Sequence, residues 1–190
     1  TLADAGWNAG TGRKRGTDGR EIAECDLLVC WGGNPVNTQI NVMHKYQHAR
    51  RERGARLVVV DPYRTDTALK ADLHLMLRPG TDGALACAVM HVLFEEGFAD
   101  WDYLERYTDC PSELRKHLKP RHPGWASEIT GISTGEILEF ARLYGSTKKS
   151  FLRIGYGFTR SRNGATAMHS VSSLPAVTGA WSEMGGGALY

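Results

Sequence analysis

The feature that most limits the possible folds is an apolar run that stops abruptly at two glycines. This run, DLLVCWG (Asp26–Gly32), is followed by Gly33, Asn34 and Pro35 and then by a polar segment with helical spacing. A second apolar run, LVVVDP (Leu57–Pro62), begins after the length of one helix. Short apolar runs bounded by turn residues are typical of strands covered on both faces. The pattern therefore predicts a right-handed βαβ unit with parallel strands.

The segment between these strands, residues 37–54, is predicted to be one helix. Met43 and Tyr46 recur at helical intervals, and Gly54 is a natural C-cap. A third strand, LHLML, is predicted over residues 73–77. The helix after it is expected to begin at Thr81 or Asp82 and to end at Gly97.

The rest of the chain adds one more strand to this unit. Residues 150–157, SFLRIGYG, predict a fourth strand that again ends on glycines, and residues 163–179 predict a helix with Pro175 at a bend. The chain is thus predicted to be a single α/β domain, residues 1–190, with a doubly wound, mostly parallel, Rossmann-like sheet and helices on both faces. Its expected parts are an irregular lead-in (1–25), a βαβ core (26–98), a helical segment (99–149), and a last strand and helix (150–190).

Charge and apolar content argue against two classes of function. No apolar run approaches the roughly 20 residues that span a bilayer, so no membrane insertion is expected. A net charge of +2 is too small to predict nucleic-acid binding. The basic stretch Lys45–Arg56 keeps that function open as an alternative, although a solvated helix face explains the stretch more simply.

The metal-binding residue types do not form a recognisable pattern. The four cysteines (Cys25, Cys30, Cys87 and Cys110) include no C-x-x-C pair, so neither a zinc site nor an iron–sulfur cluster is predicted within this chain. His44 and His48 lie one helical turn apart, but no third ligand accompanies them. No metal ligand and no catalytic residue is therefore assigned.

The most informative positions are the strand exits, because ligands of open parallel sheets bind at the carboxyl ends of the strands. Gly32 and Gly33 allow a ligand to approach the backbone, and the following helix directs its free amides toward an anion. Asn34 and Thr38 add neutral donors. A simple tight turn remains the alternative explanation of this motif.

The second and third exits carry charged candidates. Asp61 ends the second strand, where Rossmann-like folds place an acid that binds ribose hydroxyls. Tyr63 can stack on a base or sugar, and Arg64 can neutralise a phosphate. Asp82 can pair with the N1 and N2 donors of guanine, and capping of the next helix is the alternative role.

Taken together, WGGNP, VVVDPYRTDTALKADLHLMLRPGTDGAL, RIGYGFTRSRNG and LPAVTGAWSEMGGG resemble the molybdopterin oxidoreductases of the dimethyl sulfoxide reductase superfamily, which includes formate dehydrogenases and nitrate reductases. The resemblance covers residues 26–187. It implies the third domain of such an enzyme, which holds one guanine dinucleotide of a bis(molybdopterin guanine dinucleotide) cofactor with molybdenum or tungsten.

The resemblance also implies a role for each strand exit. Many members carry arginine at the position of Tyr63, so charge neutralisation here is expected to rest on Arg64. The implied cofactor-binding residues are Gly32, Gly33, Asn34 and Thr38 for phosphates or nucleoside; Asp61, Tyr63 and Arg64 for ribose and phosphate; Pro79, Gly80 and Asp82 for guanine; and Gly155, Tyr156 and Gly157 for the pterin side.

By the same likeness, the chain is a fragment of a longer enzyme and is expected to be inactive alone. The ligand to the metal and a 4Fe-4S cluster would lie before Thr1, and the second pterin site would follow Tyr190. The expected partners are the remaining domains of the enzyme and electron-transfer subunits. Members occur in the cytoplasm and the periplasm, and the cytoplasm is favoured here. A stand-alone Rossmann-like domain, either NAD-type or a nucleotide sensor, is the competing hypothesis, although its G-x-G-x-x-G pattern is missing.

Overall fold

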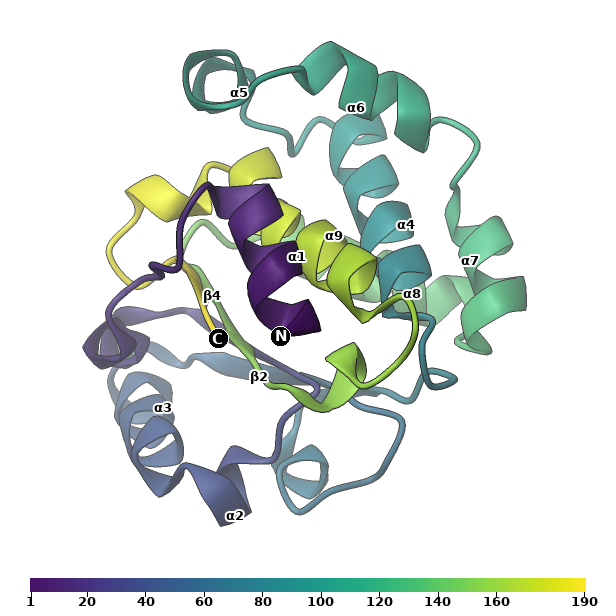
Figure 1. The fold of residues 1–190 in the computed structure, drawn as a ribbon. Coiled ribbons are helices and arrows are strands. Elements are labelled where there is room, and N and C mark those ends of the chain that lie inside the picture. The colour runs from purple at the N-terminus through teal and green to yellow at the C-terminus, as the bar shows by residue number, and fades with distance from the viewer.

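The computed structural model describes residues 1–190 and contains a parallel sheet with helices on both faces (Figure 1). All neighbouring strands are parallel, and their order is β3-β2-β1-β4-β5. This arrangement confirms the predicted α/β, doubly wound, Rossmann-like class. The strands are β1 (Leu27–Trp31), β2 (Arg56–Val60), β3 (Leu73–Leu75), β4 (Ser150–Ile154) and β5 (Gly187–Leu189).

Helices form the two outer layers. The α-helices are α1 (Leu2–Thr11), α2 (Pro35–Thr38), α3 (Ile40–Arg53), α4 (Asp82–Glu95), α5 (Trp101–Tyr107), α6 (Pro111–Leu118), α7 (Pro123–Thr130), α8 (Thr134–Ser146) and α9 (Gly164–Val177). The 3-10 helices are η1 (Gly19–Glu24), η2 (Ala68–Lys70), η3 (Gly157–Thr159) and η4 (Ala180–Ser182). None of the helices is long and apolar enough to cross a membrane.

The alternation of side chains along each strand divides the core into two unequal parts. Leu27, Val29 and Trp31 of β1 point into the larger core, which α1, α4, α8 and α9 cover (Figure 1). Leu28 and Cys30 point into the smaller core under α3 and η1. Because residue 31 follows the same alternation, the indole of Trp31 lies inside the larger core, directly below the sheet edge where β1 ends.

The prediction of an irregular lead-in over residues 1–25 is wrong. Residues 2–11 form α1, whose first turn has a capping box between Thr1 and Asp4. Glycines misled the sequence reading, because a Cβ on Gly6 would lie 2.1 Å from the Ala165 carbonyl oxygen, and one on Gly10 would meet α9 as well. These glycines allow α1 to pack closely on α9 and do not break the helix.

Two further boundaries differ from the prediction. The helix expected over residues 37–54 is interrupted at Gln39, whose backbone angles (φ −146°, ψ 62°) separate α2 from α3. Strand β5 was not predicted, because it is only three residues long and begins with Gly187. The predicted C-cap at Gly54 (φ 70°) is confirmed, and a capping box of Ser133 with Glu136 begins α8.

The two edges of the sheet differ. The outer edge of β5 is covered by the chain before η1, where the Thr17 N–H donates to the carbonyl oxygen of Ala188 at 2.9 Å. No strand pairs with the outer edge of β3. The side chains of Leu69 and Met76, near that edge, are 61% and 60% exposed.

Candidate functional site

The candidate site lies where β1 and β4 end, because the strand order reverses between these two neighbours. The chain proceeds from β1 toward β2 and β3 on one side, and β4 leads to β5 on the other. Such a switch point is where open α/β sheets bind ligands. The exits at this point are Gly32–Asn34 after β1 and Gly155–Gly157 after β4, so the fold brings these two predicted groups together.

Backbone hydrogen bonds fix the two exits to each other. The Gly155 N–H donates to the Trp31 carbonyl oxygen at 2.7 Å, and the Gly157 N–H donates to the Gly32 carbonyl oxygen at 3.1 Å. A Cβ on Gly155 would lie only 2.2 Å from the Gly32 carbonyl oxygen. Gly32 itself has a φ of 64°, a left-handed conformation that favours glycine. Internal packing thus explains both of these glycines.

Gly33 has no such internal explanation. Its φ lies outside the left-handed region, and a Cβ placed on it would meet no atom closer than 3.5 Å. The fold would therefore accept a side chain at this position. The absence of one leaves the backbone open on its outer side, which suits a ligand that approaches the main chain closely.

Asp82 is buried and bonded within the protein. The residue is 2% exposed, and its Oδ1 accepts a hydrogen bond from the Trp31 Nε1–H at 2.8 Å. Burial raises the pKa of this carboxyl to about 6. Capping of α4, the alternative role, is wrong, because neither Thr81 nor Asp82 makes a side-chain cap. The predicted contact with guanine stays a prediction.

The Trp31 indole joins the elements behind both exits. Its ring lies 6.3 Å from the ring of Phe140 in α8 and 6.4 Å from that of Phe158 in η3, measured between centroids. Phe158 packs in turn on Gly32, where an added Cβ would lie 2.8 Å from its ring. Sequence reasoning missed Trp31 and Phe158; the signal available was one aromatic residue with a polar N–H at the end of an otherwise aliphatic strand.

The exit of β3 reaches the same region through one hydrogen bond. The side-chain amide of Asn163, just before α9, donates to the Gly80 carbonyl oxygen at 2.8 Å. Gly80 has a φ of 80°, and the neighbouring Pro79 is exposed. The loop of Pro79 and Gly80 is therefore held beside the loop that follows β4, as the sequence reading requires of a shared site.

Asn34 has a structural role that its sequence context did not reveal. Its Oδ1 accepts from the hydroxyl of Thr67 at 2.7 Å, and Thr67 is fully buried. Thr38 is exposed, and its hydroxyl donates to the Asn34 carbonyl oxygen at 2.9 Å. The amide oxygen of Asn34 thus ties the exit of β1 to η2, and the amide nitrogen is left for another partner.

The exit of β2 is more open. Asp61 is half-buried, its Oδ1 accepts from the Tyr63 N–H at 2.9 Å, and burial raises its carboxyl pKa. Its Oδ2 has no protein donor, so this oxygen could accept from a ribose hydroxyl. Tyr63 is 73% exposed here, and Tyr156 at the exit of β4 is 51% exposed.

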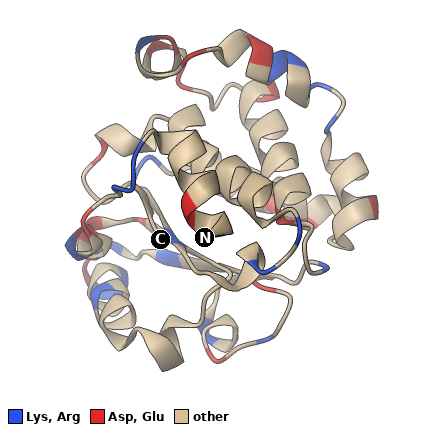
Figure 2. Ribbon diagram, in the orientation of Figure 1, with Lys and Arg blue, Asp and Glu red and all other residues tan.

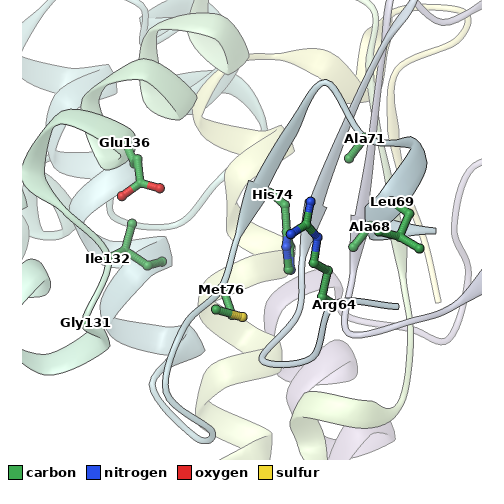
Figure 3. Close-up of a pocket in the computed structure, with 9 residues that line it drawn as sticks. All are labelled: Arg64, Ala68, Leu69, Ala71, His74, Met76, Gly131, Ile132 and Glu136. Carbon is green, nitrogen blue, oxygen red and sulfur yellow. The ribbon is translucent and has the colours of Figure 1, made fainter. Parts of the chain in front are cut away.

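Arg64 lies beside β3 and not among the residues of the switch point. It lines a groove of about 520 Å³ beside β3, together with His74 on its own side and Ile132 and Glu136 across the gap (Figure 3). None of the other predicted cofactor residues lines this groove. The structure therefore separates Arg64 from the glycines with which it was grouped.

The basic stretch is partly neutralised within the chain. Arg50 pairs with Asp72 at 3.0 Å and Arg53 with Asp26 at 2.8 Å. Figure 2 shows the lysine and arginine positions of α3 in blue. Burial raises the pKa of the Cys30 thiol to about 12, which makes it unreactive. No group of three histidine, cysteine or acidic residues is placed to hold a metal ion.

Comparison with known proteins assigns the chain to a family. The profile of the family described as molybdopterin oxidoreductase matches residues 7–189. The chain belongs to this family. It is 40% identical over 184 residues to the "Probable oxidoreductase YoaE" of Bacillus subtilis, which covers 97% of this chain and 27% of that protein.

Other family members are similar over most of the chain. Dimethyl sulfoxide reductase DmsA of Escherichia coli is 33% identical over 187 residues (86% of this chain, 23% of that protein), and formate dehydrogenase H of the same organism is 34% identical over 159 residues (84% and 22%). Acetylene hydratase from Pelobacter acetylenicus shares the fold, with a TM-score of 0.81 and 24% identity over 95% of this chain and 24% of that chain. The chain spans about a quarter of the length of these proteins.

Proposed function

We propose that this chain holds one guanine dinucleotide of a bis(molybdopterin guanine dinucleotide) cofactor at the β1/β4 switch point. The observation that carries the proposal is that the glycine exits of β1 and β4 meet there in a chain of this family. Gly33, which internal packing does not require, leaves the backbone open to such a ligand. The free Oδ2 of Asp61 can accept a hydrogen bond from a ribose hydroxyl of the ligand.

The residues of the chain would bind and orient the cofactor. Gly32, Gly33 and Thr38 would face the phosphates, Asp61 and Tyr63 the ribose, and Pro79 and Gly80 the guanine. Gly155–Gly157 would meet the pterin side, and Arg64 would supply positive charge from the β3 side. When bound, the metal of the cofactor would exchange two electrons with the substrate, with molybdenum or tungsten as that metal.

The whole enzyme extends beyond this chain in the proposal. Its other domains would supply the metal ligand, the second dinucleotide site and a 4Fe-4S cluster, and electron-transfer subunits are proposed as further partners. We propose no nucleic-acid contact, no membrane insertion and no catalytic residue within these 190 residues. The favoured compartment is the cytoplasm.

The test is the nucleotide content of the purified full-length protein. Nucleotide released by acid is identified by chromatography, and metal is measured by mass spectrometry. We expect guanine nucleotide in a two-to-one ratio to molybdenum or tungsten, and a much lower content in Gly33→Val, with the protein still folded. Adenine nucleotide in place of guanine would support the Rossmann alternative, and a protein that lacks both nucleotide and metal would refute the proposal.

A further inference from the structure

We infer that Asp82 is a positioning residue, which orders the cofactor site through Trp31 rather than by pairing with the guanine base. The inference rests on the proposed function of the same edge of the sheet. It starts from the one side-chain hydrogen bond that links α4 to β1, from the Trp31 indole N–H to the Asp82 carboxyl, 51 positions apart in the chain.

The placement of Asp82 argues against direct recognition of a base. Bidentate pairing with guanine requires both carboxyl oxygens at the surface, and Asp82 is 2% exposed with Oδ1 already bonded to the indole. No lysine or arginine forms an ion pair with it, and Asp61 is the charged group whose field reaches it. The carboxyl lies behind the binding edge.

The position of Trp31 explains how Asp82 affects that edge. The indole is fully buried and lies between Asp82, Phe140 and Phe158. The backbone carbonyl oxygen of Trp31 accepts from the Gly155 N–H, and Phe158 packs against Gly32. One residue therefore contacts the parts that set the spacing of the two glycine exits, the exit of β4 through its backbone carbonyl and Phe158 through its ring. The hydrogen bond to Asp82 fixes the rotation of this side chain, since an indole has only one polar group to orient it.

Three variants of the full-length protein separate positioning from direct contact. Asp82→Asn keeps an oxygen that accepts from the indole but removes the charge. Asp82→Leu fills the volume without an acceptor, and Trp31→Phe keeps a ring without the N–H. Trp125→Phe, in α7, is the matched control for the loss of a tryptophan.

For a positioning role we expect Asp82→Asn to retain the wild-type content of guanine nucleotide and Asp82→Leu and Trp31→Phe to lose it several-fold. The double variant that combines Asp82→Leu with Trp31→Phe should lose no more than either single variant, because both substitutions remove the same bond. Loss in Asp82→Asn as deep as in Asp82→Leu would show that the carboxylate itself contacts the base and would overturn the inference. Full retention in Asp82→Leu would overturn it as well.

A spectroscopic readout does not depend on the cofactor. In protein labelled with 5-fluorotryptophan, the ¹⁹F resonance assigned to Trp31 by its loss in Trp31→Phe should shift with pH in the wild type, with a midpoint near the pKa of Asp82. It should not shift in Asp82→Asn. A shift of equal size in Asp82→Asn would refute the coupling even if Asp82→Leu failed to fold. A wild-type protein without guanine nucleotide would instead refute the proposed function, and these spectra would still decide whether the two residues are coupled.

Discussion

The exits of β1 and β2 lie on the same edge of the sheet but are built in opposite ways. Behind the exit of β1 lie a buried indole and a backbone bonded to the exit of β4. The exit of β2 presents exposed Tyr63 and Arg64 and is held by few side-chain bonds. The difference indicates that the β1/β4 part of the site is preformed, whereas the β2 part can adjust to a ligand.

The strongest way to break this comparison is to force the two glycine exits apart. Gly155→Ala places a Cβ 2.2 Å from the Gly32 carbonyl oxygen, so the backbone must move. We expect a loss of about 2–4 kcal/mol in the free energy of unfolding, measured by urea denaturation, together with loss of guanine nucleotide. Gly33→Ala is the matched control, because its Cβ has room. It should leave stability nearly unchanged and lower nucleotide content alone. Equal destabilisation by both substitutions would contradict the preformed exit.

The second largest effect concerns the charge beneath the β1 exit. The pKa of Asp82 rises on folding from 3.8 to about 6, so its contribution to stability is full below pH 3.8 and is lost as pH rises through that window. Asp82→Asn removes this pH-dependent loss of stability, because an amide does not titrate. The stability of the variant relative to the wild type should therefore increase by about 2.4 kcal/mol between pH 4 and pH 7. Urea denaturation at several pH values measures this difference, and a constant difference would show that the carboxyl does not titrate in this range.

A smaller effect is expected where the exit of β1 is tied to η2. Asn34→Ala leaves the buried O–H of Thr67 without an acceptor, although its oxygen still accepts from the Val36 N–H, at a cost of about 1–3 kcal/mol in unfolding free energy. Asn34→Asp keeps the accepting oxygen and should retain most of the stability. Thermal unfolding of the pair checks this expectation, and indistinguishable melting temperatures would mean that the bond to Thr67 contributes nothing.

The smallest effect on stability is expected at the exit of β2. Arg64→Ala removes an exposed side chain without an ion-pair partner, so unfolding free energy should change by no more than about 0.5 kcal/mol. Guanine nucleotide content should fall by less than in Gly33→Ala, because Arg64 lies on the β3 side, apart from the glycines that would face the phosphates, and would act only by longer-range attraction. Arg51→Ala on α3, away from the site, is the control. Unchanged nucleotide content in Arg64→Ala would remove this residue from the proposed site and sharpen the division between the two exits.

The sequence predicted those parts of the site that are marked by glycines at the ends of apolar runs. Gly32, Gly33 and Gly155 interrupt apolar runs, and the parallel topology then determines that their loops meet. The bond between Trp31 and Asp82 was not predictable in this way, because it joins residues from separate elements and depends on which face of β1 each side chain takes. The helix that contains Gly6 and Gly10 was missed for a related reason. These glycines allow close packing against α9, and helix propensity, which is a local quantity, does not include that packing.

The unequal edges of the sheet have a consequence for how the domain can be joined to others. Since the chain around Thr17 already bonds to β5, a further strand cannot be added on that side without displacing it. The edge at β3 carries no such cover, and the groove that contains Arg64 runs beside it. A further strand can therefore pair with this sheet only beside β3, so the two edges of the domain are not equivalent for joining another domain.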